Sequence, residues 1–126
     1  MGYESRIYIV HKNHSDDPDG TRLCFVLASV NASKCDGLYN IFNDSKCWIY
    51  ADDGNTEIRK DCYGDCLKEA EIKDVLDFIE KKEIELQSLG YKLHQFYPGL
   101  SILYHTLNGV SSTNTWDNLV CLHYGY

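Results

Sequence analysis

The stretch from Leu67 to Leu89 constrains the fold most, because its apolar residues recur at helical spacing with Lys and Glu interleaved between them. These apolar positions are Ile72, Val75, Leu76, Ile79, Leu86 and Leu89. Gly90 follows directly, where the end of a helix favours glycine. We therefore predict one amphipathic helix here, and its apolar stripe must be buried against a second layer.

Strand-like segments supply candidates for that layer. Residues 4–11 and 21–30 are rich in branched and aromatic side chains and flank a polar, turn-forming segment, which predicts a hairpin. Residues 47–51 and 56–59 predict a second hairpin around an Asp-Gly turn. Leu119 to Tyr124 is apolar and predicts a final strand.

Shorter helical segments are also indicated. Pro98 suits the first turn of a helix and Asn108-Gly109 suits its end, which predicts a second helix between them. Its apolar face would contain Leu100, Leu103, Tyr104 and Leu107. The spacing of Leu38, Ile41 and Phe42 predicts a further helical turn or two.

The 126 residues match the size of one domain, so we predict a single α+β domain over residues 1–126. Two amphipathic helices need one sheet to cover them, and the predicted sheet is mainly antiparallel with about five strands. The residues expected in the core are Leu23, Phe25, Leu27, Ile72, Val75, Leu76, Ile79, Leu103, Leu107 and Val120.

Charge and hydropathy exclude two classes of partner. The net charge of −7 argues against general nucleic-acid binding, which needs a cationic surface. The longest apolar run, Leu23–Ala28, has six residues where a membrane helix needs about 20. Because no basic segment followed by an apolar one opens the sequence, we expect a cytoplasmic protein.

Six cysteines are expected to be free thiols in that compartment. Cys62 and Cys66 lie four residues apart and, with histidines, are the alternative candidates for a zinc site. Structural zinc sites usually combine one closely spaced pair of ligands with a second pair further along the chain. The other cysteines of this sequence are isolated and supply no second pair. We therefore expect no metal and no cofactor.

Tyr50-Ala51-Asp52-Asp53 resembles the metal-binding tetrapeptide of reverse-transcriptase palms. Two-metal chemistry also needs a further carboxylate and basic surfaces for template and nucleotide, for which this short acidic chain has no room. The favoured interpretation is that Asp52 and Asp53 form the hairpin turn with Gly54. The alternative is that the two carboxylates are catalytic.

Cys121 and His123 are two residues apart on the final predicted strand, so their side chains point to the same face. A thiol beside an imidazole is the minimum for a cysteine nucleophile, which makes this pair a second catalytic alternative. The apolar neighbours favour a simpler interpretation, in which Cys121 is a small core residue.

Residues 86–116 contain one formally charged side chain, Lys92, among many aromatic residues. Such a stretch combines a buried stripe with a contact surface, because large exposed apolar patches are uncommon on monomers. Interface hot spots are enriched in Tyr and Trp, so we predict Tyr91, Tyr97 and Trp116 as partner-binding residues. The acidic residues of the preceding helix would steer association.

Several blocks of the sequence together resemble a group of small uncharacterised proteins from phages and prophages of Gram-positive bacteria. The blocks are residues 1–8, Tyr50–Ile58, Tyr63-Gly64-Asp65 and Trp116–Tyr126. The resemblance implies a bacterial cytoplasm and interference with a host enzyme or defence system. It transfers no catalytic residue.

Two functional hypotheses follow. The first is a non-enzymatic, phage-encoded cytoplasmic protein that binds a host protein such as a component of a defence system, with inhibition of that protein as one consequence to test. The second is a small metal-dependent or Cys/His hydrolase acting on a nucleotide or similar substrate. An enzyme needs several titratable groups converging in one pocket, whereas a binding protein needs only a surface. The sequence shows no strong convergent set and therefore favours binding.

Overall fold

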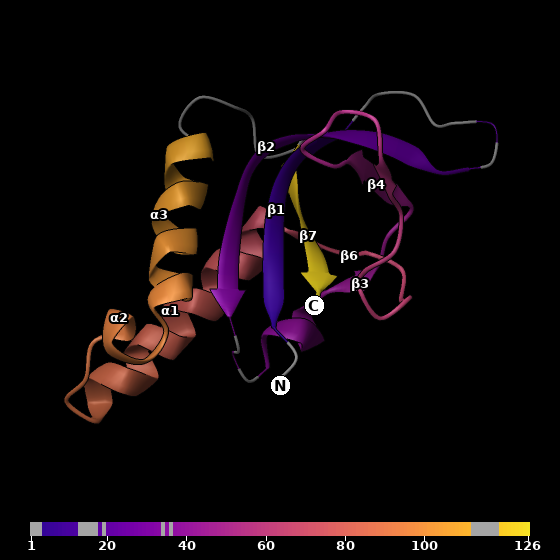
Figure 1. The fold of residues 1–126 in the computed structure, drawn as a ribbon. Coiled ribbons are helices and arrows are strands. Elements are labelled where there is room, and N and C mark those ends of the chain that lie inside the picture. The colour runs from indigo at the N-terminus through magenta and orange to yellow at the C-terminus, as the bar shows by residue number, and fades with distance from the viewer. Residues whose placement is uncertain (1–3, 13–17, 19, 34, 36, 112–118) are drawn as a thin grey trace.

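The computed structural model describes residues 4–12, 18, 20–33, 35, 37–111 and 119–126, which form one α+β unit (Figure 1). The strands are β1 (Ser5–Lys12), β2 (Arg22–Ser33), β3 (Asn43–Asp44), β4 (Cys47–Tyr50), β5 (Glu57–Ile58), β6 (Lys68–Glu71) and β7 (Leu119–Gly125). The helices are α1 (Ile72–Ser88), α2 (Leu93–Phe96) and α3 (Pro98–Ser111), with a 3-10 turn, η1 (Leu38–Ile41). Within these described ranges, no helix has the length and hydropathy needed to cross a membrane.

The described strands form a seven-stranded sheet in the order β3-β6-β7-β1-β2-β4-β5. The antiparallel pairs β1–β2 and β4–β5 confirm both predicted hairpins, and β7 lies antiparallel to β1 as the predicted final strand. The expected count of about five mainly antiparallel strands is too low, and β2 pairs with β4 in parallel. The two strands that were not predicted are β6 and β3, and the two residues of β3 are too few to show an alternating pattern.

The predicted long helix begins later than its apolar pattern suggests. Lys68 to Glu71 form β6, which pairs with the buried strand β7, and α1 begins at Ile72. Tertiary pairing overrides the helix preference of Lys, Glu and Ala in this short segment. The end of α1 is as predicted, because Gly90 has a φ of +85° and the amides of Gly90 and Tyr91 donate to carbonyl oxygens of the last turn.

The second predicted helix is α3, which continues past Asn108-Gly109 to Ser111. Gly109 does not have a positive φ, so it extends the helix instead of ending it. The four-residue α2 was not predicted, because so short a helix shows no periodicity. The predicted turn around Leu38 is confirmed as η1.

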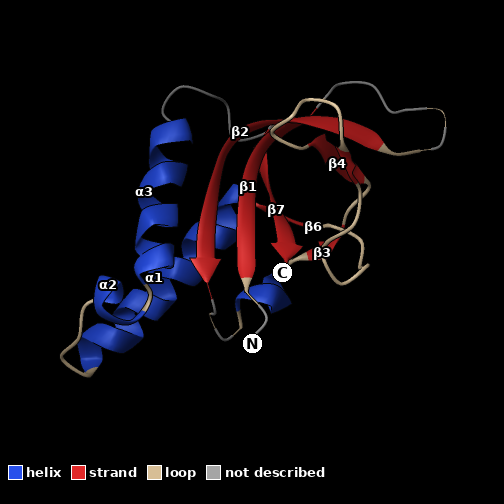
Figure 2. Cartoon of the chain, in the orientation of Figure 1, coloured by secondary structure: helices blue, strands red, loops and turns tan. Residues whose placement is uncertain are grey.

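Two cores lie on opposite faces of the sheet. The helices α1 and α3 cover one face (Figure 2). The larger core on this face, called the main core below, includes Ile7 and Ile9 of β1 with Val75, Ile79 and Leu103 of the helices. The smaller core on the other face is built from Val10, Cys24, Cys47, Ile49, Leu67, Val120 and Leu122. The β4–β5 hairpin therefore covers part of the sheet that the helices leave open.

Most of the predicted core residues are buried, namely Ile72, Val75, Leu76, Ile79, Leu103, Leu107 and Val120. The prediction is wrong for Phe25 and Leu27, which are 57% and 45% exposed, and Leu23 is half-buried. β2 has a bulge in this segment, because Ile9 pairs with Ala28 but Val10 pairs with Val26. Leu27 between them has no partner in β1, and the inward–outward alternation shifts there. The core under the helices includes β2 residues from Ala28 onward, so Phe25 lies beyond the part of β2 that this core covers.

Candidate functional site

The turn between α1 and α2 lies at the end of the helical layer (Figure 1). Several apolar side chains at this turn are exposed. We define the helix-end surface as Leu89, Tyr91 and Phe96, whose side chains are 70%, 46% and 52% exposed. The rings of Tyr91 and Phe96 meet edge to face, with centroids 4.8 Å apart. Exposed aromatic pairs of this kind are costly in water and typical of contact surfaces.

Backbone hydrogen bonds fix the turn that carries this surface. The amide of Tyr91 donates to the Leu86 carbonyl oxygen at 2.9 Å, and the Lys92 amide donates to the Gln95 side chain at 2.7 Å. The positive φ of Gly90 allows the chain to reverse between them. The surface is therefore held in place before any partner arrives, which reduces the entropy cost of binding.

The three predicted contact residues fall in different environments. Tyr91 is exposed and belongs to the helix-end surface. Tyr97 is half-buried and packs against the main core, with the Lys82 ammonium 5.9 Å from its ring centroid. Trp116 lies outside the described residues. Sequence reasoning missed Leu89 and Phe96, although both lie in the charge-poor stretch that drew attention to Tyr91.

The paired aspartates occupy the β4–β5 turn, as the favoured interpretation predicts. One carboxylate oxygen of Asp53 accepts hydrogen bonds from the amides of Asn55 and Thr56, and the other accepts from the Thr56 hydroxyl. These bonds, led by that hydroxyl, lower the pKa of Asp53 to about 2. Asp52 instead lines a cavity of about 350 Å³ beside Tyr8 and Tyr50.

The catalytic alternative for this turn needs a cluster of ligands. Among the described residues, no three His, Cys, Asp or Glu side chains are grouped as a metal site requires. The Asp53 carboxylate is engaged in hydrogen bonds within the turn. Asp52 faces a cavity lined mainly by aromatic and aliphatic residues. The arrangement suits a structural turn better than metal-dependent catalysis.

Replacing Asp53 by alanine is expected to lower the melting temperature, because the amides of Asn55 and Thr56 lose their acceptor. Asp53→Asn keeps one acceptor oxygen and should lie between Asp53→Ala and the wild type. Asp52→Ala is the matched control and should melt like the wild type, since the turn bonds belong to Asp53. Thermal unfolding by circular dichroism measures all three. Equal losses for both alanine variants would contradict this assignment.

Cys121 and His123 share a face of β7 but have separate environments. Cys121 is fully buried in the main core, and burial raises the pKa of its thiol to about 12. His123 Nε2 lies 2.7 Å from the Ser5 hydroxyl, and its ring packs against Tyr39 and Phe42. A thiol with so high a pKa stays protonated at neutral pH and is a poor nucleophile.

His123 should make the fold sensitive to acid. Burial lowers its pKa below the ordinary 6.5, with Lys68 acting in the same direction and Asp61 opposing. The unfolded chain therefore takes up the proton at higher pH than the folded chain, so stability is full above 6.5 and falls as the pH drops below it. In urea unfolding between pH 7 and about pH 5.5, His123→Gln should lose less stability than the wild type. Parallel losses in the two proteins would contradict this.

Cys62 and Cys66, the alternative zinc ligands, are both exposed. The Cys66 thiol donates to Asp44 at 3.4 Å, and the Lys68 ammonium lies 2.7 Å from the same carboxylate oxygen. Burial and the Asp44 carboxylate raise the pKa of Cys66, which weakens it as a metal ligand. All six cysteines are free thiols in the structure.

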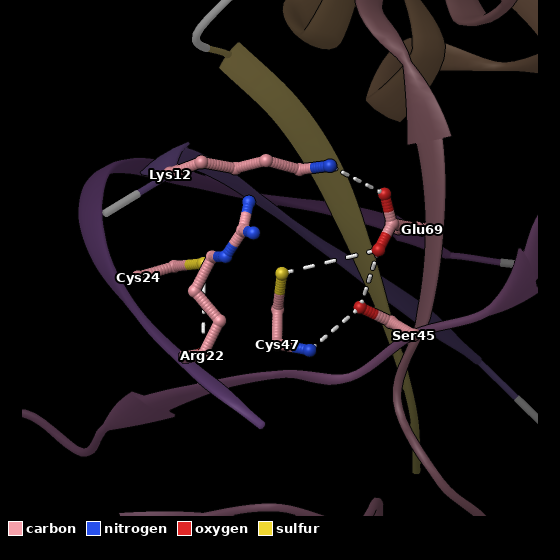
Figure 3. A network of polar contacts seen from close by, with 6 residues as sticks. All are labelled: Lys12, Arg22, Cys24, Ser45, Cys47 and Glu69. Carbon is pink, nitrogen blue, oxygen red and sulfur yellow. Dashed lines mark hydrogen bonds and ion pairs between the residues drawn. The ribbon is translucent and has the colours of Figure 1, made fainter. Parts of the chain in front are cut away.

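Sequence reasoning missed a polar network beside the smaller core, on the side of the sheet opposite α1 and α3 (Figure 3). Glu69 of β6 accepts hydrogen bonds from the Ser45 hydroxyl at 2.8 Å and the Cys47 thiol at 3.9 Å. The Lys12 ammonium lies 3.0 Å from the second Glu69 oxygen. Cys24 of β2 lies beside this group, and its thiol donates to the Arg22 carbonyl oxygen at 3.8 Å.

The network lowers the pKa of the Cys47 thiol to about 7. The neighbouring Cys24 thiol is the largest cause of this lower pKa, and Ser45 and Lys12 act in the same direction. Burial and the Glu69 carboxylate oppose them. No sequence motif marks these residues, since they come from four strands and a turn that only the fold brings together.

Comparison with family models, curated proteins and solved structures finds no match to this chain.

Proposed function

We propose that this chain is a non-enzymatic binding protein whose helix-end surface docks into an apolar groove on a partner protein. The observation that carries the proposal is the exposed, edge-to-face pair of Tyr91 and Phe96 on a turn held by backbone hydrogen bonds. Aromatic anchors that keep their conformation on binding are typical of interface hot spots. Leu89, two residues before Tyr91 in the sequence, is 70% exposed, the highest value among the large hydrophobic residues described.

Charges of both signs surround the helix-end surface. The second half of α1 exposes Glu80, Glu83 and Glu85 together with Lys81, and Lys92 is exposed between Tyr91 and Phe96. Charged residues around an apolar centre mainly set the orientation of the partner and the association rate. The partner class suggested by the resemblance to phage proteins is a host protein of a bacterial cytoplasm.

The enzymatic alternative has less support. Asp53 is engaged in a turn, Cys121 is buried and protonated, and Cys66 has a raised pKa. These groups lie in different parts of the fold and do not converge on one cavity. Binding through a surface requires no such convergence.

Capture from a bacterial lysate tests the proposal when wild type is compared with two variants of matched size and exposure. Phe96→Ser removes an anchor of the helix-end surface, and Phe25→Ser removes an equally exposed phenylalanine from β2. We expect at least one protein, identified by mass spectrometry, to be captured by wild type and by Phe25→Ser but lost with Phe96→Ser. Identical captured proteins for all three would contradict the proposal.

A further inference from the structure

We propose that the cavity between the sheet and the β4–β5 hairpin binds an organic amine in its cationic form. Asp52 supplies the negative charge of this site, and Tyr8 and Tyr50 supply its aromatic walls. The cavity has a volume of about 350 Å³, at the lower end of the range of about 300–1,000 Å³ that small-molecule sites occupy. The site is separate from the helix-end surface and does not depend on the proposed binding function.

Side chains from three segments of the chain meet at this cavity. Tyr8 comes from β1, Ser29 comes from β2, and Tyr50 and Asp52 come from the β4–β5 hairpin. Tyr8 packs against the smaller core, so the cavity lies on the side of the sheet opposite α1 and α3. The fold, and not closeness in sequence, therefore assembles the site.

The bulge in β2 directs two of its residues into the cavity. Val26 and Ser29 are three residues apart, so in a regular strand their side chains would point to opposite faces. Because Leu27 has no partner in β1, the alternation shifts there, and both side chains line the same cavity. Bulges that redirect side chains in this way are common beside active sites.

The polar side chains of the cavity are available to a ligand. Among the described residues, the hydroxyl groups of Tyr8, Ser29 and Tyr50 and the Asp52 carboxylate have no hydrogen-bond partner. The neighbouring Asp53 carboxylate, by contrast, accepts three hydrogen bonds within the turn. A few polar groups that converge on an otherwise apolar cavity are typical of small-molecule sites.

The charge of the cavity favours a cation. Asp52 is the one charged side chain among the described lining residues, and Arg6 of β1 instead lies over the Tyr126 ring, 5.6 Å from its centroid. Aromatic rings attract organic cations, and carboxylate and hydroxyl oxygens accept hydrogen bonds from an ammonium group. The apolar side chains of Val26 and Ile58 suit the hydrocarbon part of such a ligand.

The turn of the hairpin holds Asp52 in place. The Gly54 amide donates to the Ala51 carbonyl oxygen at 2.9 Å, and the Ala51 amide donates to the Thr56 carbonyl oxygen at 2.8 Å. The Asp53 carboxylate closes the same turn through its bond from the Thr56 amide. The position of the charge is therefore set before a ligand arrives, which lowers the entropy cost of binding.

Titration of the full chain, followed through its amide NMR signals, tests the proposal. Butylammonium is the cationic probe and butanol is its neutral isostere. We expect butylammonium to shift the signals of Ser29, Ala51 and Asp52 and to bind about fivefold more tightly than butanol, the size of effect typical of an exposed ion pair. A lysine capped at both backbone ends carries the same alkylammonium chain. Tighter binding of capped lysine than of butylammonium would support a protein side chain as the ligand, and weaker binding would support a free amine.

Variants assign the binding to the residues of the cavity. Asp52→Asn keeps the turn, whose bonds belong to Asp53, and should weaken butylammonium binding about fivefold without affecting butanol. Glu80→Gln is the matched control, because it removes the same charge from an exposed residue of α1, on the other side of the sheet. Tyr50→Leu should weaken butylammonium more than butanol, because it removes an aromatic ring. Equal affinity of butylammonium for wild type and Asp52→Asn, or no signal shift in the wild type, would overturn the proposal.

Discussion

Gly99→Ala is expected to lower the free energy of unfolding by about 1–3 kcal/mol. Gly99 lies in the first turn of α3, where that helix crosses β2. A Cβ added there would lie 2.6 Å from the Asn31 carbonyl oxygen and 2.8 Å from the Ala32 Cα. Both are backbone atoms, so no side chain can rotate away, and either the strand or the helix must move.

Gly109→Ala is the matched control, in the same helix. A Cβ at this position meets nothing within 4 Å, and its φ is not positive. Alanine in a helix interior should therefore stabilise the protein by about 0.5–1 kcal/mol. Urea unfolding of the two variants measures the difference directly. A Gly99→Ala protein as stable as the wild type would show that α3 does not pack on β2 as closely as described.

The second large effect concerns binding. Against a partner identified by its dependence on Phe96, the double change Tyr91→Ser with Phe96→Ser should weaken affinity tenfold or more, about 1.4 kcal/mol. Because both rings are about half exposed, the melting temperature should change little. Tyr97→Ala should behave differently, because it leaves a cavity against the main core and lowers the melting temperature.

Isothermal titration calorimetry and thermal unfolding on the same samples separate these cases. Phe25→Ser should bind like the wild type, since its equally exposed ring lies on β2. A double variant that melts at a much lower temperature would show that Tyr91 and Phe96 support the fold. In that case the helix-end surface would not be a contact site.

Local patterns predicted the elements that depend on local chemistry. The Asp-Gly turn, the glycine at the end of α1 and the strands of the first hairpin each follow from residues close in sequence. Tertiary pairing determined the rest. Lys68 to Glu71 form a strand because β7 offers a partner, and Phe25 and Leu27 are exposed because the core under the helices includes β2 residues from Ala28 onward.

The functional residues also fall into two groups, those that local sequence indicated and those that only the fold brings together. The lack of charge between Leu86 and Trp116 pointed to the segment that carries the helix-end surface, although it could not separate exposed Tyr91 from half-buried Tyr97. The polar network around Glu69 could not be predicted, because Lys12, Ser45 and Cys47 are far apart in sequence and only the fold brings them to this carboxylate. Sequence spacing had instead singled out Cys121, which the fold buries in the main core.

Amide hydrogen exchange of the complex with the captured partner tests the central claim most directly. The proposal predicts slower exchange on binding in residues 89–97, which contain Leu89, Tyr91 and Phe96, and unchanged exchange in residues 22–30 of β2. Protection confined to β2 or to the β4–β5 hairpin, with residues 89–97 exchanging as in the free protein, would contradict it.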